Sequence, residues 1–208
     1  MDAAGERLSS LGAYVGESGT TRLRPIRRSD ADDLFPEVHG RHSVTQWLCW
    51  EGPADLAEMR DRYQSWHRGL ASEPLLIFAI EEARDEESSP AAIGELTLRF
   101  DGHPGIGDLG YWLGEVHHGQ GHGSRALSLA VEFAFEQLDA RVLTASVKEG
   151  NRASVAMLEA EGFHLEPAPG REAQGGAGES GGKAARPGPS IAWYASLTRR
   201  AWARIKAR

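Results

Sequence analysis

A short glycine-rich segment is the part of the sequence whose residue types are best suited to bind a ligand. Gly119, Gly121 and Gly123 stand at alternate positions, directly before a stretch with helical periodicity. Glycines leave the main-chain N–H groups of a turn uncovered, and a helix start adds unpaired N–H donors and the positive end of the helix dipole. Segment 119–123 therefore predicts an anion site suited to a phosphate or pyrophosphate.

Familiar phosphate loops differ from this segment. A Walker loop ends in Gly-Lys-Ser/Thr, and no lysine stands here. The dinucleotide fingerprint is Gly-x-Gly-x-x-Gly, whereas this segment is Gly-x-Gly-x-Gly and follows an expected antiparallel strand. The spacing alone leaves two readings open: a phosphate cradle of another kind, and a helix start that holds no ligand.

Histidines flank the glycines. His118 and His122 are four residues apart, but the glycines between them argue against a shared helix face. No glutamate accompanies them as it does in a His-Glu-x-x-His zinc helix. We therefore expect no metal site. Both imidazoles are instead expected beside the phosphates, where partial protonation would strengthen anion binding near pH 6 and weaken it toward pH 8.

The elements that must position the loop follow from periodicity and from turn residues. Strands are expected at 21–27, 75–81, 92–100, 109–113, 141–147, 163–166 and 191–197, and helices at 32–38, 53–69, 124–138, 151–161 and 199–208. In the strand at 92–100, alternation places Leu96 and Leu98 on one face and Glu95 on the other. The strand–loop–helix–strand unit from Leu109 to Val147 implies one right-handed parallel crossover. The order predicts an α/β sandwich with a mixed, mostly antiparallel sheet.

Two segments are expected to lie outside the packed domain. Residues 1–19 mix glycine, serine and short side chains without a period, which is typical of a flexible arm. Pro167–Pro189 is crowded with Gly, Pro, Ala and Ser, and it cannot bury enough apolar surface to offset its ordering entropy. We expect it to be a mobile insertion between the two closing strands.

Composition excludes several classes of protein. The 23 basic and 30 acidic residues give a net charge of −7, which argues against a nucleic-acid partner. The one cysteine, Cys49, excludes an intrachain disulfide and a cysteine zinc site. Neither a signal peptide nor a stretch of about 20 apolar residues is apparent, so we expect a cytoplasmic protein that does not interact with membranes.

Two motifs in order make the sequence similar to a known family. His118-Gly-Gln-Gly-His-Gly123 resembles the Arg/Gln-x-x-Gly-x-Gly/Ala signature of the GNAT acetyltransferases, with His118 in place of Arg or Gln. Asn151-Arg-Ala-Ser154 followed by Gly162-Phe163 is similar to the RimJ/RimL-like branch. The resemblance covers Thr21–Trp202 and implies a GNAT domain over 20–208, with the central sheet flanked by helices in a three-layer α/β/α sandwich.

The resemblance implies an N-acetyltransferase that uses acetyl-CoA as cosubstrate. The acetyl group would pass to a primary amine, of a protein N-terminus or a small molecule, by direct attack. The pyrophosphate would lie on amides of the glycine loop, and the pantetheine would lie between the fourth and fifth strands. The implied cofactor-binding residues are Leu113, His118, Gly119, Gln120, Gly121, His122, Gly123, Ser124 and Asn151. Ser154 would protonate the departing thiolate, and Glu95 is our choice to accept the amine proton.

Departures from the family pattern keep an alternative open. Leu158 stands where many relatives carry a tyrosine that serves as general acid, and His118 removes a fixed cation. The alternative hypothesis is therefore a CoA-binding sensor or interaction module with impaired catalysis. In this family the two early helices form the wall of the acceptor site. Three tryptophans fall at these helices: Trp47, Trp50 and Trp66. They either shape that wall or belong to the core. Dimers are common in this branch, so a homodimer is one candidate assembly.

Overall fold

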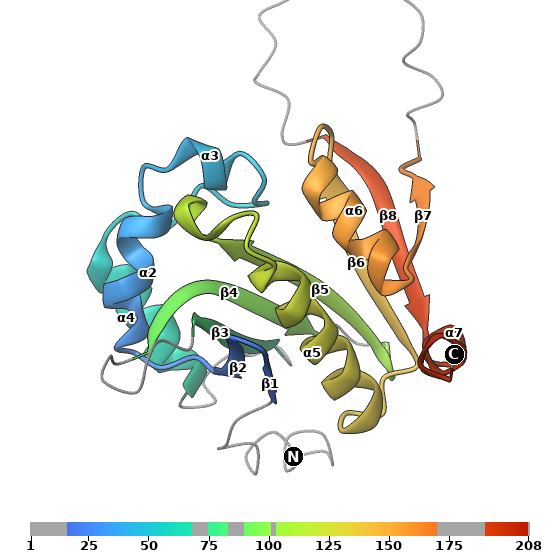
Figure 1. Ribbon diagram of the computed structural model, residues 1–208. Coiled ribbons are helices and arrows are strands. Elements are labelled where there is room, and N and C mark those ends of the chain that lie inside the picture. The colour runs from blue at the N-terminus through green and yellow to red at the C-terminus, as the bar shows by residue number, and fades with distance from the viewer. Residues whose placement is uncertain (1–15, 68–74, 83–89, 101–102, 170–189, 208) are drawn as a thin grey trace, which may run out of the picture.

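A mixed β-sheet forms the centre of the protein. The computed structural model describes residues 16–67, 75–82, 90–100, 103–169 and 190–207 (Figure 1). Within these residues the sheet has eight strands in the order β1-β2-β3-β4-β5-β6-β8-β7. All neighbouring strands are antiparallel except β5 and β6, which are parallel. The strands are β1 (Gly16–Ser18), β2 (Thr21–Pro25), β3 (Leu75–Glu82), β4 (Ala91–Arg99), β5 (Ile106–Leu113), β6 (Val142–Lys148), β7 (His164–Pro167) and β8 (Ile191–Thr198).

Helices cover both faces of the sheet. One face carries α5 (His122–Glu136) and α6 (Arg152–Glu161), and the other carries α2 (Asp30–Val38) and α4 (Leu56–His67) (Figure 1). The short helix α3 (His42–Thr45) and the 3-10 turn η1 (Glu115–His117) lie near the end of β5, and α7 (Arg199–Lys206) follows β8. A separate buried apolar cluster fills the space on each face. The expected three-layer GNAT sandwich is confirmed.

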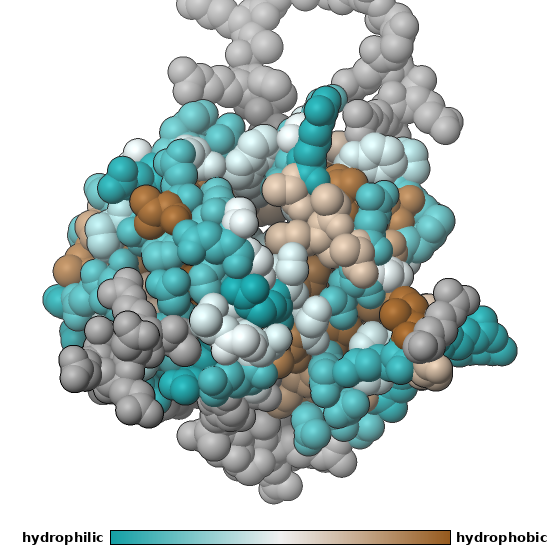
Figure 2. All heavy atoms as spheres, in the orientation of Figure 1, coloured by the Kyte–Doolittle hydropathy of each residue, from teal (hydrophilic) through white to brown (hydrophobic). Residues whose placement is uncertain are grey.

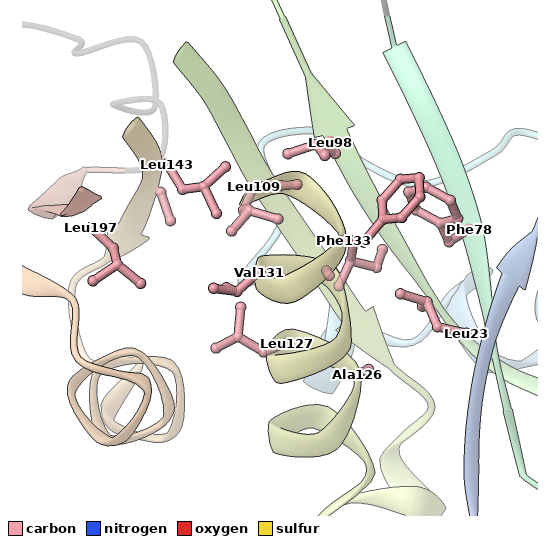
Figure 3. Packing of buried hydrophobic residues seen from close by; sticks show 14 of the residues in the cluster. Leu23, Phe78, Leu98, Leu109, Ala126, Leu127, Val131, Phe133, Leu143 and Leu197 are labelled. Atoms are coloured by element: carbon pink, nitrogen blue, oxygen red, sulfur yellow. The ribbon is translucent and has the colours of Figure 1, made fainter. Parts of the chain in front are cut away.

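The packing of α5 follows from its apolar stripe. Leu127 and Val131 are 1% and 0% exposed, and Figure 3 shows them between the helix and side chains of β5, β6 and β8. The rings of Phe133 and Phe78 meet edge to face with centroids 5.8 Å apart. Complete burial of one such side chain stabilises a fold by about 1.5–3 kcal/mol. The helix is therefore fixed firmly on the sheet, and its N-terminus is fixed with it.

Strands β5 and β6 separate part of the way along their length. Their parallel pairing begins at Ile106 and Val142 and ends at Leu109 and Ala145. Each strand continues beyond that point, β5 to Leu113 and β6 to Lys148, without pairing to the other. Figure 1 shows the two strands diverging from their shared end toward α3 and α6. We call the stretches that do not pair with each other, 110–113 of β5 and 146–148 of β6, the split of the sheet. Each stretch still pairs with its other neighbour, β4 or β8.

Several elements differ from the sequence prediction in detail. Gly16–Ser18 pairs with Thr21–Leu23, so the end of the expected arm is a strand. The helix expected from Pro53 begins at Leu56, because the Asp55 side chain accepts a 2.8 Å hydrogen bond from Glu58 N and caps the helix there. Helix α3 was not expected. Residues 1–15 of the arm, 68–69 of the expected helix and 170–189 of the expected insertion lie outside the described residues.

Candidate functional site

The glycine loop leads from the split into α5. Gly119 and Gly121 have φ values of +73° and +80°, a region that favours glycine over any residue with a Cβ. No side chain caps α5 at Gly121, and the first hydrogen bond of the helix runs from Arg125 N to Gly121 O. The N–H groups at the start of α5 therefore have no partner inside the helix. The loop therefore has the positive-φ glycines and the uncapped helix start on which the predicted anion site depends.

A side chain missed by the sequence reasoning completes the loop. The Arg125 guanidinium donates to Gln120 O (3.0 Å) and to Thr21 Oγ1 (2.8 Å), so it is fixed beside the glycines. A Cβ at Gly121 would lie 2.6 Å from Arg125 Nη1. Arg125 thus places a cation next to the glycines, in a loop where His118 stands in place of the Arg or Gln of the family signature. Its place four residues after Gly121, on the first turn of α5, was the signal that could have revealed it.

The two histidines occupy different environments. His118 is exposed, and its Nε2 lies 3.0 Å from Leu113 O, at the end of the split. The His122 side chain is 2% exposed, with Nδ1 2.8 Å from Thr21 Oγ1 and Nε2 3.3 Å from Glu82 Oε1. The expectation that the His122 imidazole lies beside the phosphates is therefore corrected. It packs against β2 and β3, and only its main-chain N–H belongs to the loop.

The buried His122 imidazole should make stability depend on pH. Burial lowers its pKa, and the positive charge of Arg125 lowers that pKa further. The folded state therefore favours the neutral ring. Below about pH 6.5, this histidine binds more protons in the unfolded chain than in the folded chain. We expect the free energy of unfolding to fall between pH 7 and pH 5, and to fall less in His122→Gln. Urea denaturation across this range measures both slopes. His164→Gln, which changes an exposed ring, serves as the control, and equal slopes in wild type and His122→Gln would contradict the prediction.

Asn151 and Ser154 meet at the start of α6. The Asn151 side chain accepts a 3.1 Å hydrogen bond from Ser154 N, which makes Asn151 the N-cap of the helix. The Ser154 hydroxyl lies 2.8 Å from the Tyr111 hydroxyl, and Tyr111 stands on the part of β5 that borders the split. The helix start therefore places one polar side chain against the split. Sequence reasoning did not select Tyr111.

Glu95 lies on the other face of the sheet. Its carboxylate is 2% exposed, and it accepts hydrogen bonds from Arg62 and from the Tyr63 hydroxyl (2.7 Å). Burial, followed by the negative charge of Glu95, raises the pKa of Tyr63, so the phenol stays protonated. Helix α4 thus covers Glu95 and occupies both of its oxygens. Any role for Glu95 in proton transfer stays a prediction, and an incoming amine could reach it only if Tyr63 or Arg62 moved.

A second carboxylate lies in an open hollow at the base of the split. The hollow has a volume of about 330 Å³ and is lined by Asp108, Thr144, Ser146, Glu166, Tyr194, Ala195 and Ser196. It lies on the face opposite α5, because Leu143, Ala145 and Val147 of β6 point toward α5 and the residues between them point away. The Thr144 hydroxyl donates to Asp108 Oδ1 at 3.0 Å. Asp108 is therefore a carboxylate that a second substrate could reach.

Helix α3 spans the open end of the split. The Ser43 hydroxyl donates to Glu115 Oε2 (2.7 Å) beyond β5, and Lys148 Nζ at the end of β6 donates to Gln46 O (2.7 Å). Trp47 lies near Gly150 in the same region. Trp66, by contrast, packs against the apolar core and donates its indole N–H to Leu75 O. The sequence leaves wall and core open for these tryptophans; Trp47 lies at the split, whereas Trp50 and Trp66 pack against the core.

The surface around these groups is hollowed. In the space-filling view an indentation separates the β5 and α3 side of the molecule from α6 (Figure 2). Within the described ranges, no group of three or more His, Cys, Asp or Glu side chains could hold a metal ion. None of the described helices is long and apolar enough to cross a membrane.

Comparisons with known proteins identify the family. Residues 21–164 match the family model of the acetyltransferase (GNAT) domain. The chain is 38% identical over 152 residues to the Bacillus subtilis protein named "Probable N-acetyltransferase YjcK", an alignment that covers 71% of this chain and 82% of that protein.

Solved structures share the fold. A ribosomal-protein-S5-alanine acetyltransferase from Vibrio fischeri superposes with a TM-score of 0.66 at 17% identity, over 91% of this chain and 98% of that one. The RimL ribosomal L7/L12 α-N-protein acetyltransferase, solved with coenzyme A, superposes with a TM-score of 0.66 at 20% identity, over 89% and 98%. The chain belongs to the GNAT acetyltransferase family and is an acyl-CoA-dependent acetyltransferase.

Proposed function

We propose that the protein transfers an acetyl group from acetyl-CoA to a primary amine by direct attack. The observation that carries this proposal is the split of the sheet. It leaves one edge of β5 without a neighbouring strand for residues 110–113, and it opens beside the uncapped start of α5. An extended chain with a pyrophosphate at one end is the ligand that this arrangement fits.

The residues around the loop suit a CoA donor. A Cβ at Gly123 would lie 3.0 Å from Met157 Sδ and 3.4 Å from Leu113 Cδ1, so close approach at this point depends on glycine. We propose that main-chain N–H groups of 119–124 hold the pyrophosphate, with Arg125 as the neighbouring cation. Main-chain groups of Leu113 would hold the pantetheine. His118 would have to release Leu113 O or bind the ligand together with it. Acetyl-CoA supplies a thioester, whose acetyl group is transferred.

The hollow on the opposite face is the proposed entry for the amine. An amine is mostly protonated at neutral pH and cannot attack until it loses a proton. We propose Asp108 as the acceptor of that proton, because it lies in the open hollow next to the last paired residue of β5. Glu95 remains the second candidate. Ser154, on the face of α6, would donate a hydrogen bond to the departing sulfur.

The acceptor is proposed as a class. RimL and the Vibrio fischeri protein are named for acetylating ribosomal proteins. Tyr194, which lines the hollow, is 48% exposed, so the hollow is open to solvent on that side. Such an opening could admit the N-terminus of a protein chain as well as a small amine. We propose a protein N-terminus or a small-molecule primary amine.

An acceptor panel tests the proposal. Purified protein is incubated with acetyl-CoA and with peptides of different N-terminal residues, polyamines and amino sugars, and free thiol release is followed. We expect at least one amine to raise thiol release well above the rate without acceptor, with the acetylated product found by mass spectrometry. Tight CoA binding without turnover on any acceptor would favour the alternative of a catalytically impaired binding module.

A further inference from the structure

Two hydroxyl groups from separate elements meet beside the split. Tyr111 comes from the part of β5 that borders the split and Ser154 from the first turn of α6, and their oxygens are 2.8 Å apart. Tyr111 packs against the apolar cluster under α5, and Ser154 is partly buried. Burial raises the pKa of Tyr111, so its phenol remains protonated over the physiological range. The pair is thus a neutral contact between two groups that can each donate one hydrogen.

The direction of this hydrogen bond decides what Ser154 can do. If serine donates to tyrosine, the serine hydrogen is used, and only the tyrosine hydrogen remains for a ligand. If tyrosine donates to serine, the serine hydrogen is free. The main chain of Ser154 is already fixed by the Asn151 cap, so the side-chain torsion is the remaining freedom. A hydrogen bond donated by the Tyr111 hydroxyl would fix the side-chain torsion of Ser154 as well.

We propose that Tyr111 is a positioning residue, whose hydroxyl donates to Ser154 Oγ and directs the serine O–H into the split at the departing sulfur. This inference rests on the proposed acetyl transfer. A thiol ionises near pH 8.5, far more readily than a serine hydroxyl, so the sulfur can leave as a thiolate that accepts a hydrogen bond. The amine nitrogen forms a bond to the acetyl carbon and gives its proton to the proposed base, Asp108. The C–S bond breaks with its electron pair on sulfur, and water later supplies the proton that the thiolate takes up. Serine keeps its own proton throughout.

The pair predicts a dependence between two substitutions. Tyr111→Phe removes the donor but keeps the ring, and Ser154→Ala removes the hydroxyl that it directs. We expect each single variant to lower kcat about 10-fold, the size of one hydrogen bond of about 1.4 kcal/mol. The KM for acetyl-CoA and the Kd for CoA should stay within about two-fold, because the contact acts on the leaving group and not on binding. In the double variant, loss of Tyr111 should add almost nothing to loss of Ser154.

Tyr63→Phe is the matched control. It removes a second buried tyrosine hydroxyl, one that contacts Glu95 on the opposite face of the sheet. Its effect on kcat should be the same with and without Ser154. Thermal unfolding of all variants separates loss of fold from loss of rate.

Each result of this double-mutant cycle has one meaning. Loss of the Tyr111 effect in the Ser154→Ala background supports the proposal. Equal losses in both backgrounds would show that Tyr111 acts independently of Ser154, and a raised Kd for CoA would show a structural role, so either result overturns it. Absence of wild-type turnover on every acceptor would overturn the proposed function, and this inference with it, whereas additive losses in an active enzyme overturn the inference alone.

Discussion

Substitution of Gly121 by valine should raise the Kd for CoA about 100-fold. The φ of +80° at this position disfavours any residue with a Cβ, and the added methyl groups would enter the space held by Arg125 Nη1, 2.6 Å from the first added carbon. Turning the loop away removes main-chain N–H donors from the phosphates. A hydrogen bond to a charged group contributes about 1.5–3 kcal/mol, so loss of one or two of them corresponds to about 100-fold.

Gly40→Val is the matched control for that experiment. Gly40 also has a positive φ, +68°, but a Cβ there meets no atom within 4 Å. Both variants should lose similar stability from the strained backbone, of the order of 1–2 kcal/mol. Isothermal titration with CoA and thermal unfolding of each variant give the comparison. If Gly121→Val binds CoA as tightly as Gly40→Val does, the glycine loop is not the pyrophosphate site.

This loop could be predicted from sequence because its chemistry is carried by the main chain. Glycine spacing fixes the conformation, and the start of α5 fixes the direction of the N–H groups, so no distant residue had to be known. The sequence places Arg125 one turn after Gly121, but it does not show what holds the guanidinium beside the loop. This guanidinium is placed by Thr21, which is 104 residues away in sequence, and by Gln120 O. Long-range contacts of this kind are absent from local patterns.

The surroundings of the candidate side chains Glu95 and Tyr111 also depend on contacts that local patterns do not predict. Alternation correctly put Glu95 on the face opposite Leu96 and Leu98, but it could not show that α4 covers that face. Periodicity gives the side of a strand to which a residue points, and packing decides whether that side is open. Local patterns do not point to Tyr111, because its contact with Ser154 joins two elements separated by α5 and β6.

The split itself was expected only from the resemblance to the family. The strand–helix–strand order predicts that β5 and β6 are parallel and joined by a crossover, and their parallel pairing is confirmed. The sequence does not predict the residue at which the pairing of β5 with β6 stops. It is the last pair, Leu109 with Ala145, that places Asp108 next to the opening.

Asp108→Asn should lower kcat/KM for the amine at least about 100-fold, within the usual range for loss of a general base. Asparagine keeps the shape of the side chain and can still accept the hydrogen bond from Thr144, so the hollow should persist. What is lost is the capacity to take a proton from the incoming ammonium. Steady-state kinetics with a peptide N-terminal amine, whose pKa is about 7.7–8.0, measures the effect. The deficit should shrink as the pH rises above about 8.5, because the amine then arrives already neutral.

Two further carboxylates decide whether this assignment is correct. Glu166→Gln changes a second acid in the same hollow, one that is 74% exposed and lies 3.4 Å from His164, and it should alter kcat/KM less than about three-fold. Glu95→Gln should mainly lower the melting temperature, because it removes the buried charge that Arg62 and Tyr63 contact. A Glu95→Gln protein that folds and binds CoA but has lost turnover, beside an active Asp108→Asn protein, would return the role of base to Glu95. In that case the Arg62 or Tyr63 side chain of α4 must move to admit the amine, since these two side chains contact the two oxygens of the Glu95 carboxylate.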